Sequence, residues 1–184
     1  MSRRVYTFDL PDRFVAGTVG EPGGRVFFLQ ARKGGDVVSV VLEKTQVAVL
    51  AQQLDALLDI LSDRGVESVP AGVDPAQVDD GPLGEPLVEA FRVGAMALAW
   101  DGEHDRVVIE AAAIPEDGET SPDDTDEDPD GPDLVRIRID GPAARSFVDR
   151  ATRLVAAGRP ACPRCGEPLD PQGHICTRPN AYLN

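Results

Sequence analysis

The segment from Asp36 to Leu61, DVVSVVLEKTQVAVLAQQLDALLDIL, joins a run of β-branched residues directly to an amphipathic helical pattern. Valine and leucine dominate residues 37–42, which is typical of a strand, and apolar residues then recur at spacings of three and four over residues 45–64. The segment predicts a strand that leads straight into a helix, with one face of the helix packed on a sheet. This arrangement indicates an α+β fold.

The same pattern recurs from Asp133 to Val155, which reads DLVRIRIDGPAARSFVDRATRLV. Residue-by-residue pairing of the two segments places Val40 opposite Ile137 and Leu50 opposite Phe147, and each segment is preceded by shorter runs typical of strands. We therefore expect two fused β-β-β-α repeats related by a pseudo-two-fold axis. A chance likeness between two amphipathic α+β segments remains the alternative.

Turn-forming residues divide the chain into four parts. The expected parts are a first unit (residues 1–65), an irregular linker rich in proline and glycine (66–86), a second unit (87–158) and a tail (159–184). Strands are expected at residues 5–10, 14–19, 25–31, 37–42, 87–100, from 106 onward and at 134–139, and a second helix from Gly141 to Gly158.

Charge is unevenly distributed along this acidic chain, whose 32 acidic and 18 basic residues give a formal net charge of −14. Ten of the acidic residues lie between Glu116 and Asp133, without a basic or aromatic residue among them. Such a composition cannot bury enough apolar surface to become ordered, so residues 115–133 are predicted to form a disordered acidic loop. The acidic balance also makes nucleic acid an improbable partner.

Membrane insertion is not expected, because no apolar run approaches the roughly 18 residues of a spanning helix. Arg3 and Arg4 resemble part of a twin-arginine signal, but charged residues and a proline occupy the place of its apolar core. We therefore expect a cytoplasmic protein.

Specific chemistry is confined to the tail, where Cys162, Cys165, His174 and Cys176 fall within fifteen residues of each other. Zinc favours four thiolate and imidazole ligands in a tetrahedron, and a two-residue gap lets the first two cysteines approach one ion. We predict one structural Zn²⁺ held in a zinc knuckle. A redox pair is disfavoured because Cys162 follows a helix instead of preceding one, and three cysteines without an export signal disfavour disulfides.

Four polar residues, Arg25, Gln30, Glu43 and Lys44, lie in or beside apolar strands and are candidates for ligand or partner contacts. No nucleophile, base and acid can be combined into a catalytic set. The sequence favours a zinc-binding module that binds or scaffolds a protein partner. The alternative is a small enzyme or ligand-binding protein that uses a polar cleft between the repeats; partner identity and oligomeric state stay open.

Arginines gather on the last helix and in the tail of this otherwise acidic chain. This basic neighbourhood could meet an acidic partner, a phosphate, or the acidic loop of its own chain. Its members are Arg145, Arg150, Arg153, Arg159, Arg164 and Arg178.

The runs FVAGTVGEPGGRVFFLQARKGG, VVLEKTQVAVLAQQLDALL and CPRCGEPLDPQGHICTRPNAY resemble an uncharacterised actinobacterial family, a domain of unknown function with a C-terminal cysteine-rich knuckle. The resemblance covers nearly the whole chain and implies no assigned activity. It also implies genes near those for a histidine-phosphatase-like and a lipid-kinase-like protein, and thus a shared pathway. Nothing in this sequence resembles the active site of either.

Overall fold

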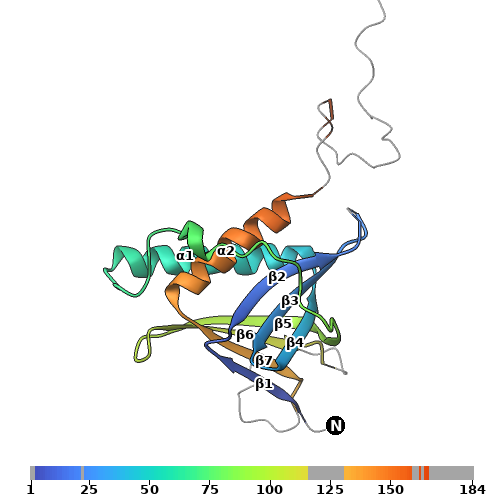
Figure 1. The fold of residues 1–184 in the computed structure, drawn as a ribbon, viewed down its shortest axis with the longest axis horizontal. Coiled ribbons are helices and arrows are strands. Elements are labelled where there is room, and N and C mark those ends of the chain that lie inside the picture. The colour runs from blue at the N-terminus through green and yellow to red at the C-terminus, as the bar shows by residue number, and fades with distance from the viewer. Residues whose placement is uncertain (1–2, 22, 116–130, 159–161, 163, 166–184) are drawn as a thin grey trace, which may run out of the picture.

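A computed structural model describes residues 3–21, 23–115, 131–158, 162 and 164–165. Within these residues the chain forms an α+β fold of seven strands and two α-helices, as expected from the sequence, and a short 3₁₀ helix that was not expected (Figure 1). The elements in chain order are β1 (Val5–Asp9), β2 (Arg13–Val19), β3 (Val26–Lys33), β4 (Asp36–Leu42), α1 (Lys44–Asp63), η1 (Pro75–Gln77), β5 (Glu89–Asp101), β6 (Arg106–Ala113), β7 (Leu134–Ile139) and α2 (Gly141–Ala156).

All seven strands belong to one mixed sheet with the order β1-β7-β6-β5-β4-β3-β2. Neighbours are antiparallel except for two pairs, β4 with β5 and β1 with β7, which are parallel. From β2 to α2 the chain reads three strands and a helix, twice. In each set of three strands, the last one also pairs with a parallel strand from outside the set: β4 with β5, and β7 with β1.

The sheet curls strongly, because β1 and β2 lie at its opposite edges although only residues 10–12 separate them. Seven flat strands at about 4.8 Å spacing would place these edges about 29 Å apart. The short link reaches about 15 Å at most. The two edges must therefore approach each other, and Figure 1 shows the strands curling beneath the helix layer.

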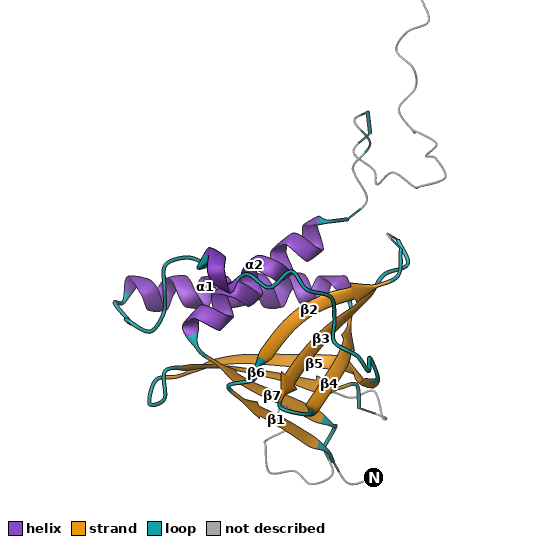
Figure 2. Cartoon of the chain, in the orientation of Figure 1, coloured by secondary structure: helices purple, strands orange, loops and turns teal. Residues whose placement is uncertain are grey.

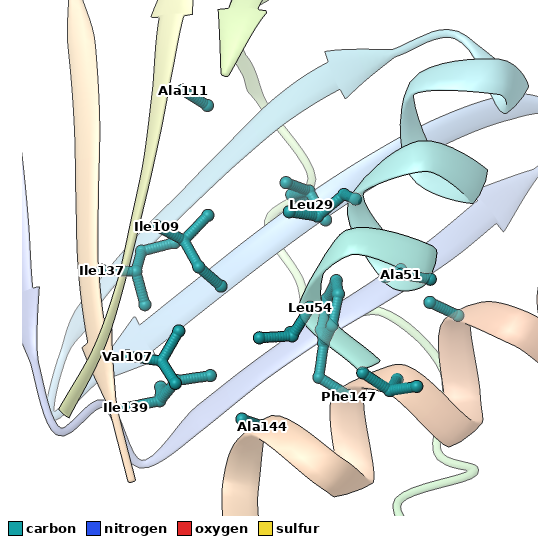
Figure 3. Close-up of a cluster of buried hydrophobic side chains, with 14 of the residues drawn as sticks. Leu29, Ala51, Leu54, Val107, Ile109, Ala111, Ile137, Ile139, Ala144 and Phe147 are labelled. Carbon is teal, nitrogen blue, oxygen red and sulfur yellow. The ribbon is translucent and has the colours of Figure 1, made fainter. Parts of the chain in front are cut away.

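Both helices lie together on one side of the curled sheet (Figure 2). Figure 3 shows Val107 and Ile109 of the sheet facing Leu54 and Phe147 of the helices in a single core. The alternation of buried residues in β6 and the stripe of α1 produce this core, as the periodicity predicts. Leu58 is fully buried on the α1 stripe.

The second helix is fixed against the outermost strand β2 by an aromatic pair. Phe147 of α2 stacks on Phe14 of β2 with ring centroids 4.6 Å apart and an interplanar angle of 10°. Arg145 of α2 reaches the other helix, donating to Asp55 and Asp59 of α1 at 2.8 Å each. These contacts hold α2 between α1 and the edge of the sheet.

Residues 66–88, here called the strap, connect α1 to β5. As predicted they are mostly irregular, but they are bound along their length to α2, β2 and β3. Ser146 donates to Gln77 O (2.6 Å) and Gln30 bonds to both backbone groups of Gly84 (2.7 and 2.9 Å). Leu83 sits so close to Gly17 that a Cβ added at that glycine would lie 2.6 Å from it.

Several expectations can be compared with the structure directly. Val40, Ile137, Leu50 and Phe147, paired by the sequence comparison, are all buried. Most of the predicted acidic loop, residues 116–130, and most of the predicted zinc knuckle lie outside the described residues. Among the helices that the structure describes, none is both long and apolar enough to cross a membrane.

Candidate functional site

A groove of about 380 Å³ lies between the first half of α1 and the middle of β5. It is located where the two β-β-β-α segments meet, which is the position proposed for a cleft, but its lining is largely apolar. No ionisable side chain of the described residues lines it. The lining residues are Thr45, Gln46, Val49, Leu50, Gln53, Gly94, Met96, Ala97 and Leu98.

The backbone register of β6 shows which groups of β5 point toward this groove. Ala113 N donates to the O atom of Asp133, the residue just before β7 (2.8 Å), so the backbone groups of Ala113 point toward the β7 side. Alternate residues of β6, including Glu110, consequently bond on the opposite side to β5, where Glu110 faces Ala97. The backbone groups of Ala97 thus point to β6.

By the same alternation, the N–H and C=O groups of Met96, Leu98 and Trp100 point to the other edge of β5. On that edge β4 pairs with β5 only at Glu89 and Arg92. Beyond Arg92, no strand within the described part of the chain pairs with this edge. We call residues 96–100 on this side the open edge of β5; it runs beside α1 along the groove.

Helix α1 itself bonds to the part of β5 that lies just before the open edge. Gln46 donates from Nε2 to Val93 O (3.1 Å) and Gly94 O (3.3 Å), where the register of β5 shifts between Val93 and Ala95. Glu43, the N-cap of α1, pairs with Arg92 at 2.9 Å. Both partners are mostly exposed, so this ion pair contributes little stability.

The two outer edges of the sheet, in contrast, are capped by charged side chains. Lys33 donates to Asp9 O on β1, and Arg150 of α2 donates from Nε to Ala16 O on β2 (2.6 Å). Charged side chains on a strand edge prevent pairing with a further strand. Of the strand edges described, the far half of β5 has no such cap.

The four polar residues that the sequence nominated do not converge on one site. Arg25 donates to Ala157 O at the end of α2 (2.7 Å), and Gln30 is buried with its amide bonded to Ser39 and Gly84. Lys44 is exposed and approaches the same end of α2 as Arg25. Arg25, Gln30 and Glu43 thus make contacts within the fold.

Two of the four predicted zinc ligands are described. Cys162 is buried and Cys165 is half-buried. His174 and Cys176 lie outside the described residues. Among the described residues alone, no group of three or more potential ligands gathers that could hold a metal ion.

A second cavity, of about 300 Å³, borders α2, the start of β2 and the strap. Arg13 donates to the Asp79 carboxylate (2.5 and 2.9 Å), and Arg150 reaches its Oδ1 at 3.2 Å. The hydrogen bonds from Arg13 are the main cause that lowers the pKa of Asp79, while burial lowers the pKa of Arg150. Gly81 O accepts from both arginines, so this cluster fastens the strap.

The sequence left three contacts open for the basic neighbourhood: an acidic partner, a phosphate, or the acidic loop of the chain, most of which lies outside the described residues. On α2, Arg145 binds Asp55 and Asp59 of α1, and Arg153 binds Asp80 of the strap. Arg159 and Arg178 lie outside the described residues.

The residues that line the open edge were not singled out from the sequence. One signal was available: residues 89–101 form a strand longer than its neighbours, and the apolar residues Met96, Leu98 and Trp100 alternate along one face of it. The alternation alone does not show how far these three side chains lie from α1.

Within the described residues, fold and groove together define a class of protein: an α+β module built on one curled mixed sheet, with capped outer edges and a strand edge left open beside a helix. Residues 6–176 match the family described as "Protein of unknown function (DUF3090)", and the chain belongs to that family. No curated protein and no solved structure matches the chain.

Proposed function

We propose that this chain is a zinc-carrying binding module of the cytosol that holds a protein partner in the groove between α1 and β5. One observation carries the proposal: apolar side chains and an open strand edge lie together in that groove. Exposed apolar grooves with unsatisfied backbone groups are typical of protein interaction sites. A catalytic site would require converging polar groups, and the four nominated ones do not converge.

The groove can be tested with a photo-crosslinking amino acid in place of Val49, in the full chain inside its native cells. Val19 is the matched control, because the two valines are 49% and 48% exposed and Val19 lies at the end of β2. We expect an adduct with one identified protein from position 49 alone, and reconstitution of the same contact from the two purified proteins. Adducts that form equally from both positions would refute the site.

Zinc forms the second part of the proposal. The donor set of Cys162, Cys165, His174 and Cys176 fits one structural Zn²⁺, since three thiolates and an imidazole satisfy its preference for four soft ligands. Elemental analysis of protein purified without chelator should give one zinc per chain. Cys162→Ser should lower that content, and unchanged zinc in the variant would refute the assignment.

We further infer that residues 36–61 and 133–155 belong to two copies of one unit. A two-fold axis through the middle of the curled sheet would relate the β4–β5 pair to the β7–β1 pair. Both of these strand pairs are parallel, as such a relation requires. Burial of all four paired residues supports the same inference. An experimental structure in which the two segments fail to superpose would exclude it.

A small ligand-binding protein is the second candidate, supported by the convergence of Arg13, Asp79 and Arg150 at the 300 Å³ cavity. It is the weaker candidate because these arginines already bind the strap. Calorimetry with inorganic phosphate tests it. Saturable binding that is lost in Arg13→Gln would support this candidate, and no detectable heat would remove it.

A further inference from the structure

We propose that the partner enters the groove as an extended strand added to the open edge of β5, with alternating apolar side chains flanked by lysine or arginine. This inference rests on the proposed function and specifies the chemistry of the partner at that same groove.

The backbone of β5 provides the first argument. Met96, Leu98 and Trp100 direct N–H and C=O groups toward an edge that no described strand pairs. Each such group needs a hydrogen-bonding partner, and an added strand supplies donors and acceptors at the matching spacing. Because Gln46 already occupies Val93 O and Gly94 O, the added strand would begin its pairing beyond them.

The side chains around the edge provide the second argument. Met96, Leu98 and Trp100 also direct their side chains toward the helix layer, where they are only partly buried. Val49 and Leu50 of α1 form the opposite wall of the groove. Alternate residues of an added strand would face this apolar surface while the others face solvent, so the strand should alternate apolar and polar residues.

Charge specifies the ends of the added strand. The hairpin that continues β5 carries Asp101, Glu103 and Asp105 against Arg106, so three carboxylates and one guanidinium leave two negative charges beside the groove. The groove lining itself is uncharged. Basic residues flanking the apolar part of the strand would therefore be attracted to the hairpin.

A second copy of this chain is the other possible occupant, since identical edges can pair about a two-fold axis. Each copy carries a formal charge of −14, and the acidic hairpin adjoins the edge in both. Like charges brought together across an interface oppose association. The charge pattern favours a basic partner.

The first measurement adds a short synthetic peptide, in which valine and threonine alternate between lysine pairs, to the full chain. Trp100 is the single tryptophan of the sequence and lies on the open edge, so its emission reports the site. A saturable emission shift is expected with this peptide. The same peptide with glutamate in place of lysine should bind at least about tenfold more weakly, a loss of about 1.4 kcal/mol.

Two N-methylated peptides separate strand addition from simple apolar contact. An added strand directs alternate N–H groups to β5, so methylation of one alternating set should weaken binding at least about tenfold, while methylation of the other set should leave it unchanged. Equal binding of both peptides would overturn the inference while leaving a protein-binding groove intact.

The variants Val49→Glu and Val19→Glu localise the effect. Val49→Glu places a charge in the groove wall, where the apolar side chains of the added strand would bury it, and this desolvation cost exceeds the attraction for lysine. The variant should therefore weaken binding of the lysine peptide at least about tenfold, whereas Val19→Glu should not. Equal effects, or no saturable shift with the lysine peptide, would overturn the inference. A doubled mass in sedimentation that Val49→Glu abolishes would identify a second copy as the occupant and likewise overturn it. Failure of the crosslinking experiment, by comparison, refutes the proposed function itself.

Discussion

The outer edges of the sheet are capped by charged side chains, whereas the described part of the chain places no such cap on the inner edge of β5 beyond Arg92. Strand β2 has α2 packed against it, the Phe14–Phe147 stack beside it and Arg150 bonded to its backbone. Strand β5 runs past the end of β4 and faces α1 across a groove. The edge of β2 beside α2 is thus capped, and we call it the closed side. The edge of β5 beside α1 is left without a pairing strand among the described residues, and we call it the open side.

The strap accounts for the closed side. It supplies Asp79 and the Gly81 carbonyl to Arg13 and Arg150, and it places Leu83 on Gly17. No described segment plays the corresponding role along β5. An open, apolar strand edge is prone to unwanted pairing, so a fold that caps its other edges and leaves this one open is consistent with use of the edge in binding.

Phe147→Ala should have the largest effect on stability, because the side chain is fully buried and stacked on Phe14. We expect a loss of about 3–5 kcal/mol in the free energy of unfolding, measured by urea denaturation. On the open side, Leu98→Ala should cost less, about 1–2 kcal/mol, because Leu98 is partly exposed before the change. Equal losses in the free energy of unfolding would mean that Leu98 is packed as tightly as Phe147, which would contradict the contrast between the two sides.

Arg150→Ala should cost about 2–3 kcal/mol, because it leaves the carbonyls of Ala16 and Gly81 without this donor. The side chain is 11% exposed, so water cannot easily replace it. Arg153→Ala, one turn further along α2, is the control: its ion pairs are exposed and should contribute less than about 1 kcal/mol. If the two variants lose the same stability, the cap on β2 is not what closes that edge.

Asp79 makes the closed side sensitive to acid. Hydrogen bonds from Arg13 lower the pKa of Asp79 below its ordinary value of 3.8, so its contribution is fully present above that pH. It is lost as the pH falls below 3.8 through the pKa of the folded state. Asp79→Asn should therefore flatten the acid limb of the stability profile below about pH 4 and leave a constant difference near neutral pH. An acid limb unchanged in the variant would contradict the role of this carboxylate.

Much of the fold could be predicted from local patterns. The strand and helix at residues 36–61 lie where periodicity placed them, because a stripe at 3.6-residue spacing and a run of β-branched residues each favour one conformation. The strand order could not be predicted, since β1 pairs with β7 about 130 residues away through contacts that leave no local signal. The curl of the sheet follows from that order.

The site was harder to predict than the fold. Polar residues in strands, such as Gln30, were candidates for the site because burial of a polar side chain has a cost in free energy. The Gln30 amide, however, forms its hydrogen bonds with Ser39 and Gly84 inside the fold. The groove instead lies where β5 extends beyond the end of β4. The point at which two strands stop pairing depends on tertiary structure. Only the alternation of Met96, Leu98 and Trp100 was visible beforehand.

Val49→Glu should have the smallest effect on stability, within about 0.5 kcal/mol of the wild type, because Val49 is half exposed and borders the open groove. Val19→Glu, the matched change near the β2–β3 turn, should lie in the same range. The pair of variants distinguishes a surface kept for binding from one needed for folding: if the groove serves a partner, charge there should impair binding and not stability. A loss above about 2 kcal/mol for Val49→Glu alone would show that α1 and β5 depend on that contact, and the contrast between the closed and open sides of the sheet would then disappear.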